Sequence, residues 1–179
     1  MSDEALIGNV LEETAFHEAG HIVIASVVGL PLIPLGITVY EADGVTEGYA
    51  GYCEVELRWE DILLALRAGV RAQRKKFPQS WTDGSQPDIL KFNEIIKSHF
   101  EGRYQEIDEK ITPRLDQLLR SHWDPVVAVV QAVMESRWIP VHSPEHRVMR
   151  RKKQLDGCTL VDILRGYRIS AEVQMGRRS

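Results

Sequence analysis

The chain contains 179 residues, of which 44% are hydrophobic and 27% are charged, and this composition is typical of one globular domain. The formal net charge of −4 provides no overall basic field, so nucleic acid is not an expected partner. The two cysteines, Cys53 and Cys158, lie far apart in the sequence, which favours a reducing, cytoplasmic setting over a secreted, disulfide-linked one.

Residues 22–40 carry no charge, which makes this stretch a candidate membrane span. Gly29, Pro31, Pro34 and Gly36 interrupt this stretch, and proline would break a helix that has to cross the bilayer. The stretch is predicted to form a helix end, a turn and a strand, with no membrane span. The N-terminus lacks the basic flank of a secretory signal, so none is expected.

The spacing of apolar residues predicts a mainly helical α+β domain with a small antiparallel sheet. The expected helices cover residues 3–28, 59–77, 86–100, 104–122, 124–138 and 159–167. Two expected strands, at 35–40 and 49–57, are joined by a hairpin-like turn over 41–47 that contains Asp43-Gly44. The basic segment at 147–153 is interpreted as a solvated helix or loop face. One domain is expected over residues 1–169, followed by a loose polar tail over 170–179.

The first predicted helix contains His17-Glu18-Ala19-Gly20-His21. Positions 17 and 21 lie one helical turn apart, so both imidazoles can reach one metal ion, and Glu18 lies beside them. Zinc in such a site lowers the pKa of its water, and the glutamate takes the proton as that water attacks a peptide carbonyl. The motif therefore predicts a zinc-dependent metalloendopeptidase that hydrolyses peptide bonds through a metal-activated water.

Two details of this helix bear on the prediction. Gly20 costs a helix about 1 kcal/mol relative to alanine, so close packing is expected at this position, for example against a strand or a substrate passing nearby. The alternative is a buried helix in which other side chains satisfy His17 and His21. Burying two histidines and a glutamate without a metal would be costly, which favours the metal site.

A catalytic zinc usually takes three protein ligands. A third histidine six residues after His21 would fall at Val27, so the extended metzincin pattern is absent. Asp88 is the better candidate, because it lies where a long loop enters a helix and its carboxylate can project into a site. A glutamate on a second helix remains open, as does a simple helix N-terminal role for Asp88.

Residues 14–23 (TAFHEAGHIV) resemble the metal-binding helix of the FtsH-type ATP-dependent zinc metallopeptidases, whose typical wording is close to A-x-H-E-A-G-H-A-x-V. Residues 84–89 are similar to the family's segment that supplies an aspartate ligand. Looser similarities complete a match to most of residues 14–165: a strand at 37–40, a Gly-Tyr pair at 48–49 or 51–52, and a D-G-x-x-L-like element at 156–160.

The resemblance implies a zincin-like FtsH-type peptidase domain. It also implies that His17, His21 and Asp88 are zinc ligands and that Glu18 is the general base. The family's Gly-Arg-Ala-Ala-Glu-Glu-like run is altered here to residues 69–74, so Asp83 is kept as an alternative ligand.

The family joins its peptidase to an ATPase domain, whereas this chain starts at the peptidase helix and has no G-x-x-x-x-G-K-[ST] loop. Unfolding of a polypeptide substrate is therefore assigned to a separate ATPase partner, and the resemblance suggests a homo-oligomer. Residues 49–54 are a candidate edge for pairing with an extended substrate.

Two alternatives to an active soluble peptidase are kept. The first is a non-catalytic, metal-stabilised regulatory or protein-binding module. The second is a site-2-type intramembrane protease, whose second motif would be Leu155-Asp156-Gly157. The remaining imidazoles are interpreted as surface residues, namely His99, His122, His142 and His146.

Overall fold

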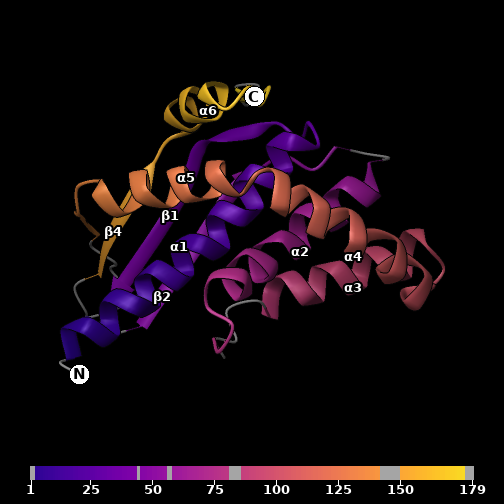
Figure 1. The fold of residues 1–179 in the computed structure, drawn as a ribbon, viewed down its shortest axis with the longest axis horizontal. Helices are drawn as coiled ribbons and strands as arrows, with labels where there is room; N and C mark the ends of the chain where they lie inside the picture. Colours follow the sequence, from indigo (N-terminus) through magenta and orange to yellow (C-terminus); the bar gives the residue numbers. More distant parts are fainter. Residues whose placement is uncertain (1–2, 44, 56–57, 81–85, 142–149, 176–179) are drawn as a thin grey trace.

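The computed structural model describes residues 3–43, 45–55, 58–80, 86–141 and 150–175. These residues form a mainly helical α+β arrangement with one four-stranded antiparallel sheet, which confirms the predicted class (Figure 1). The elements in chain order are α1 (Asp3–Val27), β1 (Leu32–Ala42), β2 (Val45–Tyr52), α2 (Trp59–Lys76), α3 (Gln86–His99), α4 (Tyr104–Ser121), α5 (Trp123–Glu135), β3 (Ile139–Val141), β4 (Arg150–Leu155) and α6 (Gly157–Gly166).

Each described helix ends within three residues of its predicted bounds. The predicted hairpin between the two strands is confirmed, but its turn is shorter than the predicted 41–47, because Ala42 already pairs with Val45. Asp43 has a φ of 49°, and aspartate tolerates this left-handed conformation in hairpin turns. The second strand consequently begins at Val45 and ends at Tyr52, several residues earlier than predicted.

The strand order in the sheet is β2-β1-β4-β3, and each neighbouring pair is antiparallel. The interpretation of the basic segment as a solvated helix or loop is wrong over 150–153, which belong to the inner strand β4. Lys153 is buried and donates to the carbonyls of Met134 and Ser136 at the end of α5, 2.6 Å away in each case. Arg151 pairs with Glu41 of β1. These partners allow a charged sequence to occupy an inner strand.

The C-terminal tail, predicted to be loose, is bound to the sheet over part of its length. Leu32 of β1 donates its N–H to the carbonyl of Glu172 at 2.7 Å, and its carbonyl accepts from the N–H of Gln174 at 2.8 Å. Residues 172–174 therefore pair with the start of β1, and over this stretch the tail is bound rather than loose.

Helix α1 runs through the middle of the molecule, with β1 and β2 along one side and α2 along another (Figure 1). Its residues 15–26 are all buried, so the predicted motif lies in the interior. At Gly20 the two helices are so close that an added Cβ would lie 2.6 Å from the carbonyl oxygen of Ala68 and 2.7 Å from the Cβ of Ala72. Close packing at Gly20 is thus confirmed, with helix α2 as the neighbour.

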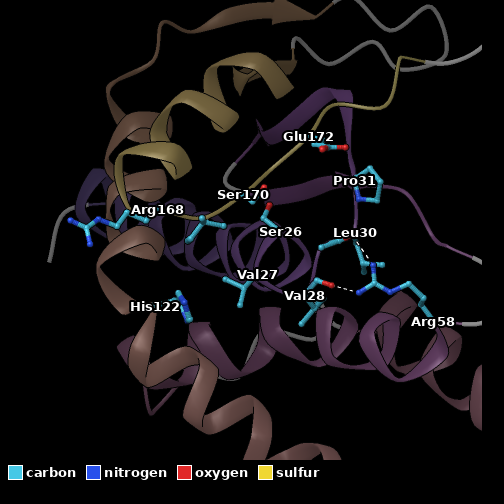
Figure 2. A pocket seen from close by; sticks show the side chains of 12 residues that line it. Ser26, Val27, Val28, Leu30, Pro31, Arg58, His122, Arg168, Ser170 and Glu172 are labelled. Carbon is cyan, nitrogen blue, oxygen red and sulfur yellow. Dashed lines mark hydrogen bonds between the residues drawn. The ribbon is translucent and has the colours of Figure 1, made fainter.

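A cavity of about 450 Å³ lies beyond the C-terminal end of α1 (Figure 2). Arg58 lies at its rim and donates to the carbonyl of Gly29 at 2.8 Å and to that of Val28. These bonds satisfy carbonyls that the end of α1 leaves without intrahelical partners.

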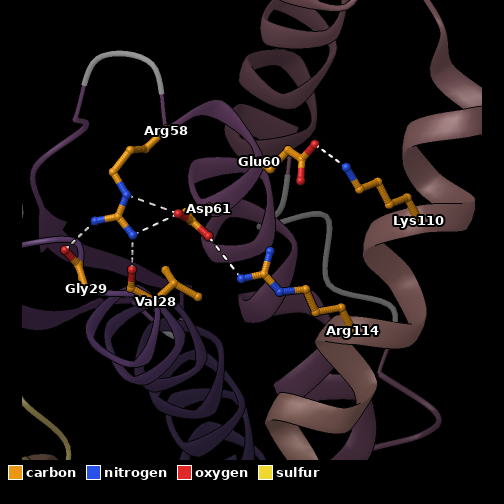
Figure 3. A network of polar contacts seen from close by, with 7 residues as sticks. All are labelled: Val28, Gly29, Arg58, Glu60, Asp61, Lys110 and Arg114. Atoms are coloured by element: carbon orange, nitrogen blue, oxygen red, sulfur yellow. Dashed lines mark hydrogen bonds and ion pairs between the residues drawn. The ribbon is translucent and has the colours of Figure 1, made fainter.

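The same arginine begins a polar network that links the turn after α1 to α2 and α4 (Figure 3). Asp61 of α2 accepts from the Arg58 Nε at 3.1 Å and from Arg114 of α4 at 3.2 Å. Glu60 and Lys110 form a further ion pair between α2 and α4. Such exposed pairs contribute at most about 1 kcal/mol each, so this network orients α4 rather than holding the fold together.

Among the helices that the structure describes, none is long and apolar enough to cross a membrane. Residues 22–40 are divided between the end of α1, a turn and most of β1, as the glycines and prolines in that stretch predicted.

We expect Gly20→Ala to lower the free energy of unfolding by about 1–2 kcal/mol. Overpacking costs about 1–3 kcal/mol, and the rigid backbone of α2 cannot yield cheaply, which outweighs the ~1 kcal/mol that alanine gains over glycine in a helix. Urea denaturation measures the change. Gly166→Ala is the matched control, because an added Cβ there meets nothing within 4 Å. Equal stability of the two variants would contradict the prediction.

Candidate metal centre

Three of the side chains singled out in the sequence come together at one point. The Nε2 atoms of His17 and His21, from α1, each lie 3.1 Å from the Oδ2 atom of Asp88, in the first turn of α3. The ligand atoms of these three residues all lie within 4.8 Å of one another. Within the described part of the chain this is the one group of three or more His, Cys, Asp or Glu side chains with such a geometry.

The other candidate ligands do not join this group. Asp83 lies outside the described residues. No glutamate of a second helix belongs to the group among the described residues. Asp156, which the intramembrane-protease alternative would require, caps α6 by accepting the N–H of Thr159 at 2.9 Å.

The hydrogen bonds of the two Nδ1 atoms determine which ring nitrogen of each imidazole carries the hydrogen. His21 Nδ1 lies 2.7 Å from the carbonyl oxygen of Ala65, which can only accept, so this nitrogen carries the hydrogen. His17 Nδ1 lies 3.0 Å from the amide oxygen of Gln73 and donates in the same way. In the neutral tautomer both lone pairs are therefore on Nε2 and face Asp88.

This donor set fits a metal cation. Two imidazole lone pairs and a carboxylate oxygen would repel one another if nothing positive lay between them. Two nitrogens and one oxygen match the ligand types of catalytic zinc sites, in which a fourth position stays open. Residues that could hold such an ion are therefore His17, His21 and Asp88.

The pKa values of the two acidic groups differ because their surroundings differ. Burial raises the pKa of Asp88, but the adjacent imidazoles of His17 and His21, which donate to its carboxylate only when they are protonated, outweigh this and hold that pKa well below its usual range. Burial raises the pKa of Glu18 to about 7, with His17 opposing the rise and Asp88 adding to it. A cation bound nearby would lower the pKa of Glu18 again.

A cleft of about 330 Å³ opens beside the three candidate ligands. Glu18 and His21 of α1 form its floor, Leu66 of α2 adds an apolar contact, and the start of α3 forms one wall. The opposite wall is β2, including Gly48, Ala50 and Tyr52, which point to the same face of the sheet because they alternate along the strand.

Two further features of the cleft could not be assigned from the sequence. Burial raises the pKa of the Tyr52 phenol, as does the nearby carboxylate of Asp88, so Tyr52 remains a neutral hydroxyl group. An ion pair between Lys91 of α3 and Glu54 just after β2 joins the two walls.

Glycines at two positions keep space for the functional side chains. A Cβ added to Gly69 of α2 would lie 2.3 Å from the His21 Nε2 and 2.7 Å from the His17 Nε2. A Cβ added to Gly48 of β2 would lie 2.3 Å from the Glu18 Oε1. The backbone therefore approaches the ligand nitrogens at one glycine and the Glu18 carboxylate at the other.

Neither of the two other histidines that the structure describes belongs to this centre. His99 is exposed and its ring stacks on Trp59 with centroids 3.7 Å apart. His122 lies near the larger cavity, and its Nδ1 is 2.9 Å from the carbonyl of Leu118. His142 and His146 lie outside the described residues.

No protein-family model matches the chain, and a search of curated proteins finds no match either. Membership of the FtsH-type family consequently remains a prediction from the motif, and function has to be argued from the geometry of the site.

We expect Gly69→Ala to weaken zinc binding by about tenfold or more, because a methyl group would displace both ligand imidazoles. Gly48→Ala is the matched variant, since it adds the same methyl group against Glu18 and leaves the ligands in place. Zinc affinity is measured by competition with a chromogenic chelator. Equal affinities of the two variants would show that the ligand nitrogens do not lie beside Gly69.

Proposed function

We propose that the protein is a zinc-dependent metalloendopeptidase with a zincin-like, FtsH-type peptidase fold. One observation supports the proposal above all: three electron-rich ligand atoms converge beside Glu18 at the floor of an open cleft. In this reading His17, His21 and Asp88 hold the metal, and Glu18 is the general base.

A bound zinc ion would supply Lewis acidity toward water and toward the scissile carbonyl. Glu18 takes one proton from the attacking water, whose oxygen bonds to the carbonyl carbon. The same carboxylic acid then returns the proton to the amide nitrogen as the C–N bond breaks, so one water is consumed for each peptide bond. Gly48 leaves room for the carboxylate in this position.

The substrate class that suits the cleft is an extended polypeptide. Strand β2 lies at the outer position of the sheet and forms a wall of the cleft. An outer strand can pair with a peptide backbone without demanding a particular sequence. The Tyr52 hydroxyl, which stays protonated, is available as a hydrogen-bond donor in the same cleft. On this proposal a folded substrate needs a separate ATPase for unfolding.

We expect elemental analysis to find about one zinc per wild-type chain, held by three protein ligands. Asp88→Ala should lose most of this zinc, since two histidines alone leave the ion poorly coordinated. Asp162→Ala is the control, because that carboxylate is exposed on α6 and far from the ligand group in the chain. A wild-type protein that binds no zinc after reconstitution would contradict the proposed metal site.

Glu18→Gln should retain zinc and lower the rate of hydrolysis of an unfolded polypeptide by about 10²–10⁴-fold, because general acid–base catalysis contributes about that much. Amide and carboxylic acid have the same shape, so the substitution removes proton transfer and little else. Peptide cleavage is followed by mass spectrometry. Wild-type protein that binds zinc but cleaves no polypeptide would favour the non-catalytic metal-stabilised module instead.

A further inference from the structure

We propose that Gln73 is a positioning residue for the metal centre, acting on His17 through a hydrogen-bond chain that reaches Glu13. The inference rests on the proposed metal site, which it extends beyond the three ligands. Gln73 is buried on α2, only 7% exposed, and its amide oxygen lies 3.0 Å from the Nδ1 of His17.

The chain continues on the far side of the amide. The Gln73 Nε2 lies 2.7 Å from the Ser80 hydroxyl and 3.4 Å from the Glu13 Oε2. The Ser80 hydroxyl lies 2.6 Å from the same carboxylate oxygen. Glu13 is on α1, one helical turn before His17, so the chain closes a loop between α1 and α2.

The direction of every bond follows from the acceptor at its end. A carboxylate accepts only, so the Ser80 hydroxyl and the Gln73 N–H group both donate toward Glu13. The amide nitrogen therefore faces Glu13, and the amide oxygen must face His17. An amide oxygen can only accept, so the Nδ1 of His17 carries the hydrogen. The Nε2 lone pair of His17 is then directed at the metal position.

The two ligand histidines differ in how they are oriented. His21 donates to the main-chain carbonyl of Ala65, which no substitution can remove. The orientation of the His17 ring depends instead on a side chain, the neutral amide of Gln73. The negative charge lies one group further away, at Glu13, and reaches His17 only through polarised hydrogen bonds.

Because Gln73 is buried, the loss of one of its hydrogen bonds is costly. Gln73 is 7% exposed, so water has little access to its amide and cannot readily replace a lost partner. Loss of Gln73 would free the His17 ring to adopt the other tautomer, in which the hydrogen lies on the nitrogen that has to bind metal.

The test uses three variants of the full chain: Gln73→Leu, Gln73→Glu, and the exchange Gln73→Glu with Glu13→Gln. Zinc affinity is measured by chelator competition, and the tautomers of His17 and His21 are read from imidazole ¹⁵N chemical shifts of the metal-free protein. Gln105→Leu on α4 is the matched control, since its amide is exposed and bonds Glu109.

We expect Gln73→Leu to weaken zinc binding by about 10–100-fold, the usual effect of losing an orienting partner, and to change the ¹⁵N shifts of His17 but not of His21. Gln73→Glu alone should also weaken binding, because it places a second carboxylate beside Glu13. The exchange should bind zinc at least as tightly as wild type, because a carboxylate then accepts directly from His17.

Unchanged zinc affinity and unchanged His17 shifts in Gln73→Leu would overturn the positioning role while leaving the metal site intact. Failure of wild type to bind zinc would instead overturn the proposed function, and the His17 tautomer would still report on Gln73. If Gln73→Leu does not fold, Ser80→Ala tests the same chain by removing only its middle hydroxyl. An exchange variant that binds zinc more weakly than Gln73→Glu would also refute the proposal.

Discussion

The close antiparallel approach of α1 and α2 is the constraint on which the candidate metal centre depends. It is possible because α2 presents small residues where α1 crosses it, namely Ala65, Ala68, Gly69 and Ala72. Helix spacing places residues 65, 69 and 73 on one face, one turn apart. The Ala65 carbonyl can therefore orient His21, Gly69 leaves room for both imidazoles, and Gln73 orients His17.

Two more parts of the chain complete the centre, and both come from elsewhere in the sequence. Strand β2 brings Gly48 against Glu18, and the first turn of α3 brings Asp88 to the two histidines. The site thus forms only when α1, α2, α3 and the sheet are all in place. Its geometry is a property of the whole packed domain rather than of the motif.

The features that depend on local spacing could be predicted from the sequence. Positions 17 and 21 share a helical face wherever that helix packs, and Asp88 was suggested by its place at a helix start and by the family resemblance. Strand β4 was missed because its alternation is hidden by basic side chains whose partners, such as Glu41 and the last carbonyls of α5, are distant in sequence. The role of Gln73 was invisible for the same reason, since only the packing of α2 on α1 reveals its contact with His17.

The charges buried at the centre explain why a divalent cation suits it. The Nδ1 hydrogen bonds select the neutral tautomer in which both Nε2 lone pairs face Asp88, while Glu18 is buried and Asp88 is half-buried. Burial is the main reason that the pKa of Glu18 rises to about 7, and the nearby carboxylate of Asp88 adds to that rise while His17 opposes it. A cation with two positive charges would balance both carboxylates and occupy the point at which the lone pairs converge. A metal ion that binds only the folded state would stabilise the packing of α1, α2 and α3 that creates the site. Folding and metal binding would then be coupled.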